Sequence, residues 1–528
     1  MPPRDAPPPR FVIGGLVASV AVASLLNFWD LQGTPPAIGG DEAFFANHGL
    51  AIAQTGRDLN GRRLPLMLQV DPNIDPGLWY QVLLVYLEAA TFAVLPFAEW
   101  SARLPVAMLA VVNTVLAWIV AVRYAGASWA GPVAATVVAL SPIHFYLSRQ
   151  AVDYIFPIAF VLLWLWWLSA LLEKPATRTA FACGLVLGLG IFSYVASWLM
   201  MPLYLLVTIA VCLPLPGRLP LSAAAAAGFA IPAGALATWL LVHPDALASV
   251  MNRYAGGAAQ LPGLNINTYY RFVDLVSAYW ASWNPAQLFL IGSPNPIIGV
   301  RTAGVFVAPV AVLLIAGVFA MRPRHPLHVA LIVGLVTAPI GPVLYGTPGA
   351  VQRQLVLIPF VAIVSALGAI TLWNRSTTIA RVTTMGTLAL CPVLFAVAAV
   401  DVFANRDAYI VRFDPSNFRE LTPALAALNR EIDAPQVVIA IGPYDRRAYW
   451  HFHTSKLNEL ALRAKAMMVE AQSVRLDQIP ANSLIVANAP SNLATELDRA
   501  CTRVAAFRAE ADVVVWRARG AGCGSVPP

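Results

Sequence analysis

Long apolar runs dominate this sequence of 528 residues. A helix needs about 20 apolar residues to cross a bilayer. Runs that reach or approach this length cover residues 11–30, 104–122, 128–148, 154–172, 179–194, 197–213, 221–242, 302–320, 327–345, 354–373 and 382–402. Only 12% of the residues are charged, whereas a soluble domain carries about 25%. The sequence therefore predicts a polytopic all-α membrane protein with about 11 transmembrane helices.

A twelfth apolar segment, residues 78–97, decides the topology. It is interrupted by Glu88 and ends at Pro96. If this segment is a juxtamembrane or re-entrant helix that does not cross, the basic residues of the short loops fall on one face: Arg123, Lys174, Arg178, Arg218, Arg322, Arg324, Arg375 and Arg381. Positive residues mark cytoplasmic loops. We therefore predict an N-terminus inside and a C-terminus outside.

Three regions are then expected outside the membrane: residues 31–103, 243–300 and 403–528. The last has the composition of a soluble domain. Its strand-like runs at 437–441, 483–487 and 513–516 alternate with helical patterns, which is typical of a small α/β domain. We predict a membrane domain of residues 1–402 and an extracytoplasmic α/β domain of residues 403–528. Cys501 and Cys523 could pair there in an oxidising compartment.

Asp41 and Glu42 form an acidic pair directly after the first apolar run. Charge at a membrane face is costly and is commonly functional. Phe45, His48 and Ile52 follow at helical spacing, which predicts an amphipathic helix along the outer membrane face, with His48 near the substrate. Asp41 could serve only as the N-cap of this helix. That reading explains Glu42 less well, and neighbouring carboxylates raise one another's pKa, which a general base can exploit.

Residues 141–153 form a second cluster, at the outer end of the third predicted span. Arg149 and Asp153 are four residues apart and share a face if the segment is helical. They could simply neutralise each other in an ion pair at the interface. The alternative is that Arg149 binds a phosphate while Asp153 orients a base or an acceptor.

A third cluster, Tyr345 to Gln354, lies in a Gly/Pro-rich stretch on the same predicted face. A guanidinium grips phosphate oxygens in a fork, so Arg353 suits a lipid-linked phosphate, with Tyr345 as a substrate contact. Arg353 could equally snorkel to the headgroups and hold a helix end.

The loop 243–300 is rich in aromatic and amide side chains. Interfacial aromatic belts are the ordinary explanation, but sugar and lipid substrates also favour aromatic faces flanked by amides. We predict that Trp283 and Asn284 bind substrate. Arg301, at the end of the loop, is a further phosphate candidate.

Signatures of other functions are missing from the sequence. No Walker loop or dinucleotide fingerprint follows a strand, and the H-x-H of His451 and His453 is a weak metal signal. We predict no cofactor and no required metal. The net charge of +7 is spread over short loops, which orients helices and does not suggest a nucleic-acid surface.

Together these residues resemble the GT-C superfamily of membrane glycosyltransferases, in particular the bacterial branch near the protein mannosyltransferases and the lipid A aminoarabinose transferase. The resemblance covers roughly residues 10–370. It rests on Gly40-Asp41-Glu42, Trp100-Ser101-Ala102-Arg103-Leu104-Pro105, the spacing from Ser141-Pro142 to Arg149 and Asp153, and Asn284-Pro285 with Leu288-Phe289-Leu290. The segment Ser193 to Trp198 departs from it, because some relatives carry a basic residue there.

The resemblance implies an inverting transfer of a sugar from a polyprenyl-phosphate donor to a lipid, glycan or protein acceptor, at the outer face of the bacterial cytoplasmic (inner) membrane. It assigns the base or orienting carboxylate to Asp41, with Glu42 in support, and a second acidic role to Asp153. It assigns donor phosphate binding to Arg149 and, less securely, Arg353. Such a base contributes about 10²–10⁴-fold.

Two other classes of function remain open. A transporter or flippase of a lipid-linked envelope precursor usually keeps its charges near the bilayer midplane on paired, broken helices. Here the charges gather at the outer ends of the spans, which favours an enzyme. A membrane-anchored binding protein would leave Asp41, Glu42, Arg149 and Asp153 without a role.

Overall fold

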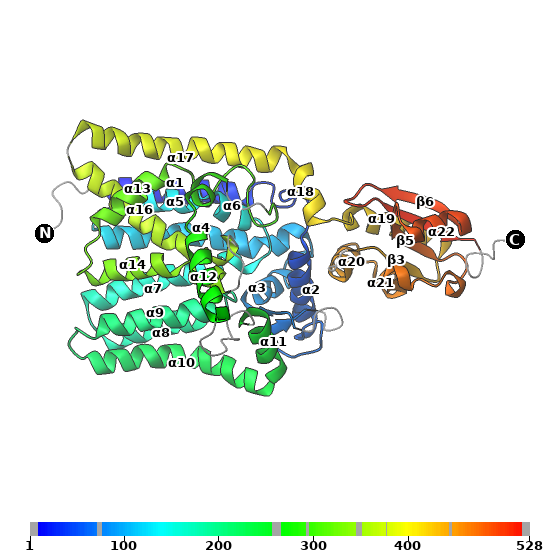
Figure 1. Cartoon of the computed structure of the whole chain (residues 1–528), viewed down its shortest axis with the longest axis horizontal. Helices are drawn as coiled ribbons and strands as arrows, with labels where there is room; N and C mark the ends of the chain where they lie inside the picture. The colour runs from blue at the N-terminus through cyan, green and yellow to red at the C-terminus, as the bar shows by residue number, and fades with distance from the viewer. Residues whose placement is uncertain are drawn as a thin grey trace. The chain divides into compact units, whose positions relative to one another are not determined.

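Figure 1 shows a computed structural model of the chain. It describes residues 9–70, 77–255, 266–291, 295–344, 351–375, 377–442 and 446–519. These residues form two compact units. The helical unit takes its residues from 1–29, 60–86 and 103–404, and the mixed unit from 30–59, 87–102 and 405–528. The mixed unit thus contains two segments from the first part of the sequence, 30–59 and 87–102, in addition to residues 405–528.

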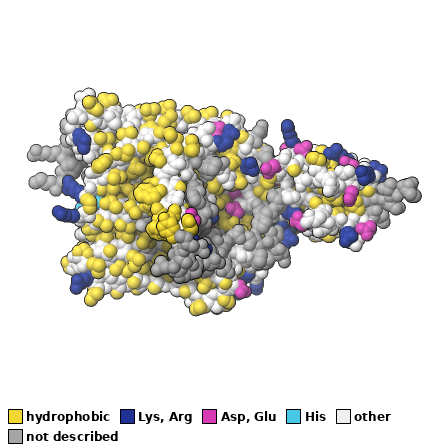
Figure 2. Space-filling view, in the orientation of Figure 1, with side chains coloured by type: hydrophobic (Ala, Val, Ile, Leu, Met, Phe, Trp, Pro, Cys, Tyr) yellow, Lys and Arg dark blue, Asp and Glu magenta, His cyan; other side chains and the backbone are white. Residues whose placement is uncertain are grey.

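Most of the helical unit is built from apolar helices, and Figure 2 shows hydrophobic side chains over its visible face. Within the described residues, five helical segments are long and apolar enough to cross a membrane: Glu99–Ala125, Asp153–Glu173, Arg218–Val242, Leu357–Asn374 and Thr378–Ala404. Seven shorter apolar helices accompany them: Ile13–Phe28, Leu83–Phe92, Ala130–Ala139, Thr177–Gly190, Ser197–Cys212, Val310–Ala320 and Pro326–Thr337. The count of 11 spans stays a prediction.

The helices follow one another in a simple order. They are α1 (Pro9–Phe28), α4 (Glu99–Ala125), α5 (Ala130–Ala139), α6 (Pro142–Leu147), α7 (Phe156–Glu173), α8 (Thr177–Gly190), α9 (Ser197–Cys212), α10 (Arg218–Val242), α11 (Pro244–Ala255), α12 (Ile266–Ala281), α13 (Val310–Ala320), α14 (Pro326–Thr337), α15 (Ile340–Leu344), α16 (Leu357–Asn374) and α17 (Thr378–Ala404). Figure 1 shows α7, α8, α9 and α10 side by side.

Glycines let two of these helices approach closely. A Cβ built on Gly184 of α8 would lie 1.8 Å from the carbonyl oxygen of Ala225 in α10, and one on Gly228 of α10 would lie 2.1 Å from that of Phe181. Small residues at helix crossings are typical of membrane bundles, because they permit backbone contact. The α8–α10 pair therefore depends on both glycines.

The segment 78–97 is not one continuous helix. Strand β2 (Trp79–Gln81) pairs antiparallel with β1 (Met67–Gln69), and α3 (Leu83–Phe92) follows. Ten residues of helix rise about 15 Å, roughly half of the hydrocarbon thickness. This length favours the juxtamembrane assignment over a twelfth crossing.

The mixed unit contains a five-stranded sheet in the order β4-β3-β5-β7-β6. Strand β3 (Val437–Ala440) lies parallel to β4 (Ala466–Met468) and β5 (Leu484–Asn488), whereas β7 (Val513–Ala518) runs antiparallel to β5 and to β6 (Cys501–Phe507). The predicted strand-like runs thus fall on β3, β5 and β7. The helices are α18 (Arg406–Phe413), α19 (Phe418–Ile432), α20 (Arg446–Lys456), α21 (Leu460–Lys465) and α22 (Asn492–Ala500).

One face of the sheet has an apolar core. Ile485, Leu497, Val514 and Trp516 are fully buried there. Cys501 is buried at the start of β6, but Cys523 lies outside the described residues, so their pairing stays a prediction.

The first helix of the mixed unit, α2 (Gly40–Thr55), carries the acidic pair and packs against α20. The side-chain amide of Asn47 donates a hydrogen bond to the carbonyl oxygen of Ala448 at 2.8 Å. The first predicted outer loop is therefore tied directly to the C-terminal fold. The boundary predicted at residue 402 stays untested.

Candidate active site

Glu42 fixes the start of the helix that carries the acidic pair. Helix α2 has Gly39 as its N-cap, and the Glu42 carboxylate accepts a hydrogen bond from the Gly39 amide at 2.7 Å. A glutamate in the first turn that bonds back to the N-cap amide forms half of a capping box. The alternative that Asp41 is the N-cap is therefore wrong. Glu42 does the capping, and Asp41, one residue earlier and half-buried, does not occupy the cap position.

The predicted amphipathic surface helix is wrong in one respect. Residues 42–49 of α2 are all buried, so its first two turns have no exposed polar face. His48 is 2% exposed, and its ring centroid lies 4.5 Å from that of Phe44. The α2 helix is thus a packed element of the mixed unit, and its acidic start is held rigidly.

A third acidic residue, Glu88, lies close to this helix. It is fully buried on α3, and neither carboxyl oxygen has a hydrogen-bond partner within the described residues. A Cβ built on Gly49 of α2 would lie 3.0 Å from the Glu88 Cβ and 3.4 Å from the Ala89 amide nitrogen. A side chain at position 49 would therefore require α2 and α3 to shift by a few tenths of an ångström.

Burial raises the pKa of Glu88 well above its ordinary value, and the negative charge of Glu42 raises it further. Glu88 therefore favours its neutral, protonated form. In the sequence pattern, Glu88 is recognised only as an interruption of an apolar run. A lone carboxylate within 83–92 was the available signal for a functional group.

Arg149 is held by the end of α1. It is fully buried, and its guanidinium donates hydrogen bonds of 2.6 Å to the carbonyl oxygens of Leu26 and Trp29. The preceding Ser148 donates to the side-chain oxygen of Asn27. Because α6 ends at Leu147, Arg149 and Asp153 do not share a helix face as the spacing predicted.

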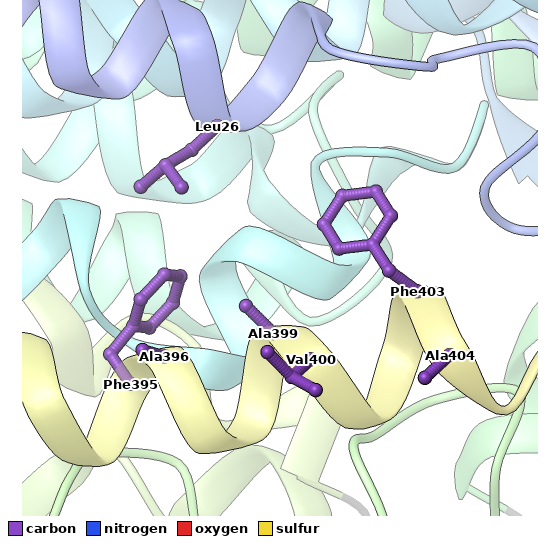
Figure 3. Close-up of a pocket in the computed structure, with 7 residues that line it drawn as sticks. All are labelled: Leu26, Phe395, Ala396, Ala399, Val400, Phe403 and Ala404. Carbon is purple, nitrogen blue, oxygen red and sulfur yellow. The ribbon is translucent and has the colours of Figure 1, made fainter.

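Figure 3 shows an apolar groove between Leu26 of α1 and six residues of α17: Phe395, Ala396, Ala399, Val400, Phe403 and Ala404. Its volume is about 440 Å³. The Arg149 guanidinium carbon lies 5.1 Å from the ring centroid of Phe403, within cation–π range. Two lining residues of the groove, Leu26 and Phe403, are therefore direct contacts of Arg149.

Asp153 begins a short 3-10 turn, η1 (Asp153–Ile155), and is 2% exposed. This turn lies next to a second one, η3 (Val351–Arg353). The fold thus brings the elements of Asp153 and Arg353 together, although 200 residues separate them in sequence. The ring centroids of Tyr154 and Tyr194 lie 5.5 Å apart beside them, in an edge-on arrangement.

Three side chains of the second cluster bind backbone oxygens at the end of the large loop and just beyond it. Ser141 donates to the Val305 carbonyl oxygen at 2.7 Å, Tyr146 to that of Pro296 at 2.6 Å, and Gln150 to that of Ile297 at 3.0 Å. These bonds fix the end of the loop against the 141–153 segment.

The remaining predicted residues of the large loop are more open. Arg301 is 44% exposed and forms an ion pair with Asp401 at 3.0 Å. The Asn284 side-chain oxygen accepts a hydrogen bond from the Ala286 amide at 3.0 Å, and Trp283 is half-buried. Tyr345 lies outside the described residues. Gln354, next to Arg353, donates to the Ser282 carbonyl oxygen at 2.9 Å, which links η3 to this loop.

Comparisons with known proteins give one consistent picture. A family model described as dolichyl-phosphate-mannose-protein mannosyltransferase matches residues 82–232. The structure of ArnT from Cupriavidus metallidurans in the apo state is similar over 95% of this chain and 98% of its own, at 14% identity and a TM-score of 0.56. The same protein bound to undecaprenyl phosphate gives 14% identity, the same coverage and a TM-score of 0.52.

A third structure, the oligosaccharyltransferase AglB from Archaeoglobus fulgidus in complex with an inhibitory peptide and a dolichol-phosphate, is similar over 90% of this chain and 69% of its own, at 13% identity and a TM-score of 0.51. No curated protein sequence matches. This chain has the GT-C fold. The resemblance to the GT-C superfamily that the sequence predicts is thereby confirmed.

Within this GT-C fold the candidate residues form two sets. Asp41, Glu42, His48 and Glu88 belong to the mixed unit, and the second set, of Arg149, Asp153, Arg353, Arg301, Trp283 and Asn284, belongs to the helical unit. No group of three or more His, Cys, Asp or Glu that could hold a metal ion occurs in the part of the chain that the structure describes.

Proposed function

We propose that this chain is an inverting glycosyltransferase that moves a sugar from a polyprenyl-phosphate donor to an acceptor at the outer face of the bacterial cytoplasmic membrane. The observation that carries the proposal is the full-length likeness to ArnT, which extends over 95% of the chain. Structures with this fold hold undecaprenyl phosphate in one case and a dolichol-phosphate in another. A polyprenyl-phosphate-linked donor is the ligand class these two have in common.

Asp41 is the proposed base or orienting group for the acceptor hydroxyl. It belongs to a buried helix whose start Glu42 holds in place. A rigid first turn suits a base, because proton transfer requires the carboxylate to lie within hydrogen-bond reach of the acceptor. Glu42 then supports the site by capping the helix, and His48 by packing inside it.

Arg353 is the proposed principal ligand of the donor phosphate, with Asp153 as the neighbouring acid. Support comes from the adjacency of η1 and η3, which places a guanidinium and a carboxylate on touching turns. Cationic stabilisation of the departing phosphate contributes to the rate because the charge develops as the bond breaks. Arg149 is proposed as a secondary phosphate ligand, since the carbonyl oxygens of Leu26 and Trp29 already occupy two of its nitrogens.

The remaining proposed contacts lie on the large loop. Trp283 and Asn284 offer an aromatic face and an amide to a sugar, and Arg301 offers a further cation. The proposed Tyr345 contact falls outside the described residues.

Mass spectrometry of envelope glycans and glycolipids from a deletion strain tests the function. We expect one glycan, glycolipid or glycoprotein to lose a single sugar residue, and the unglycosylated acceptor to accumulate. Loss of a whole precursor-derived glycan from the envelope, with the lipid-linked precursor accumulating on the cytoplasmic side, would contradict the proposal and favour a flippase.

A further inference from the structure

A basic pocket lies where three helices of the helical unit meet, away from every residue assigned above. Its volume is about 550 Å³. The lining residues come from the end of α4, the end of α7, the start of α8 and the connection between the last two: Arg123, Trp167, Ala170, Glu173, Lys174, Ala176, Arg178 and Thr179. This size falls within the range of about 300–1,000 Å³ that is typical of ligand pockets.

The pocket carries an excess of positive charge. Three cations and the single carboxylate of Glu173 leave a formal charge of +2 (three minus one). Arg123 holds that carboxylate in a fork, with its Nε 2.9 Å from one oxygen and its Nη2 2.5 Å from the other. Lys174 and Arg178 are exposed, and the side chain of neither has a hydrogen bond or ion pair with the described residues. Two cations are therefore available to an anion.

An apolar stripe runs along α4 toward this pocket. Met108, Val112 and Ile119 are exposed large hydrophobic residues, and Ile119 lies one helical turn before Arg123. Spacings of four, seven and four residues keep Met108, Val112, Ile119 and Arg123 on one side of the helix. A hydrocarbon chain on this stripe would have its polar end at Arg123.

We propose that this pocket binds the phosphate headgroup of an anionic membrane phospholipid, with an acyl chain along the α4 stripe. The position supports a lipid as the source of the phosphate, because α4 and the segment that contains α7 are long and apolar enough to cross a membrane and the pocket lies at their ends. Trp167 in the lining suits the interface, where tryptophan is enriched. Basic pockets between helices on the cytoplasmic side bind anionic headgroups, and the charge distribution of the sequence predicts that side here.

Native mass spectrometry of the purified full-length protein tests the proposal. Phosphatidylglycerol is the probe, with phosphatidylcholine of the same acyl chains as the zwitterionic comparison. The variant Lys174→Gln/Arg178→Gln removes the two unpaired cations and leaves the Arg123–Glu173 pair intact. Each basic residue near the surface is worth about fivefold in affinity, so we expect about 25-fold weaker binding of phosphatidylglycerol.

The matched control is Arg322→Gln/Arg324→Gln, which removes the same charge from two exposed arginines after α13. It should bind phosphatidylglycerol as the wild type does. An equal loss in both double variants would overturn the proposal in favour of general surface charge, and no loss in either would also overturn it. A third arm adds inorganic phosphate. If phosphate alone binds as tightly as phosphatidylglycerol, the site takes a soluble anion and the lipid assignment is wrong.

Discussion

The Glu42 carboxylate accepts a hydrogen bond from the Gly39 amide at 2.7 Å, across the first turn of α2. This bond gives the two members of the acidic pair different roles. Glu42 caps the helix and so contributes to stability, whether or not it takes part in catalysis. The neighbouring Asp41 is thereby left as the member of the pair for which catalysis is proposed.

Glu42→Ala should lower the thermal stability of the purified protein, with a free-energy cost of about 1 kcal/mol for a lost cap. Glu42→Gln should recover part of this loss, since an amide oxygen can still accept the Gly39 bond. Asp41→Asn should unfold at the wild-type temperature. If Asp41→Asn proved as destabilising as Glu42→Ala, the division of roles between the two residues would be wrong.

Glu88→Gln should change how stability depends on pH. The folded-state pKa of Glu88 is raised above its ordinary value of 4.5, so its contribution is fully present below that value and is lost as the pH rises toward the folded pKa. Glutamine cannot ionise, so the variant lacks this pH-dependent contribution to stability. Thermal unfolding across about pH 4 to 9 should therefore show Glu88→Gln gaining stability over the wild type as the pH rises.

Because the charge of Glu42 contributes to the raised pKa of Glu88, Glu42→Gln should make the pH-dependent loss of stability smaller and end it at a lower pH than in the wild type. A neutral neighbour leaves a lower folded pKa, so less stability is lost through Glu88. An identical pH profile in wild type and Glu88→Gln would show that Glu88 is already ionised, or solvated, in the folded protein.

Gly49→Ala should destabilise the mixed unit, because the new methyl group would lie 3.0 Å from the Glu88 Cβ and 3.4 Å from backbone of α3. Overpacking of this kind costs about 1–3 kcal/mol. Gly386→Ala on α17 is the control, since a Cβ there meets nothing within 4 Å. The control should be neutral or slightly stabilising, and equal effects in thermal unfolding would contradict the tight α2–α3 contact.

Arg149→Gln should impair folding, whereas Arg353→Gln should impair donor binding. The first loses charge-assisted hydrogen bonds to two carbonyl oxygens, each worth about 1.5–3 kcal/mol, so the folded yield and the melting temperature should fall. The second should fold normally and raise the KM for the lipid-linked donor. A stable Arg149→Gln protein with a selective donor defect would restore Arg149 as the principal phosphate ligand.

The sequence predicted the apolar helices and the strands β3, β5 and β7, because hydrophobic periodicity depends on local sequence alone. The clusters proposed for the site stay a prediction. The sequence did not predict the hydrogen-bond partners of the charged side chains. Arg149 is bound by carbonyl oxygens of Leu26 and Trp29, more than 100 residues away, and nothing in the local pattern encodes that contact.

The assignment of Asp41 as a cap failed for a smaller reason. The helix begins at Gly40, two residues earlier than it would with Asp41 as its cap, so Gly39 is the N-cap and Glu42 supplies the capping carboxylate. The contact of Glu88 with Gly49 of α2 is likewise a tertiary contact, about 40 residues apart in sequence, that the local pattern does not encode. The exact residue at which a helix begins, and the contacts between residues far apart in sequence, are determined by the whole fold.

The most direct test of the central claim returns the gene for Asp41→Asn to a deletion strain and measures the envelope acceptor by mass spectrometry, with wild type and Glu42→Gln beside it at equal membrane abundance. We predict that wild type restores the missing sugar, that Glu42→Gln restores it at least in part, and that Asp41→Asn leaves the acceptor unglycosylated as the deletion does. Full restoration by Asp41→Asn would contradict the assignment of Asp41 as the catalytic carboxylate.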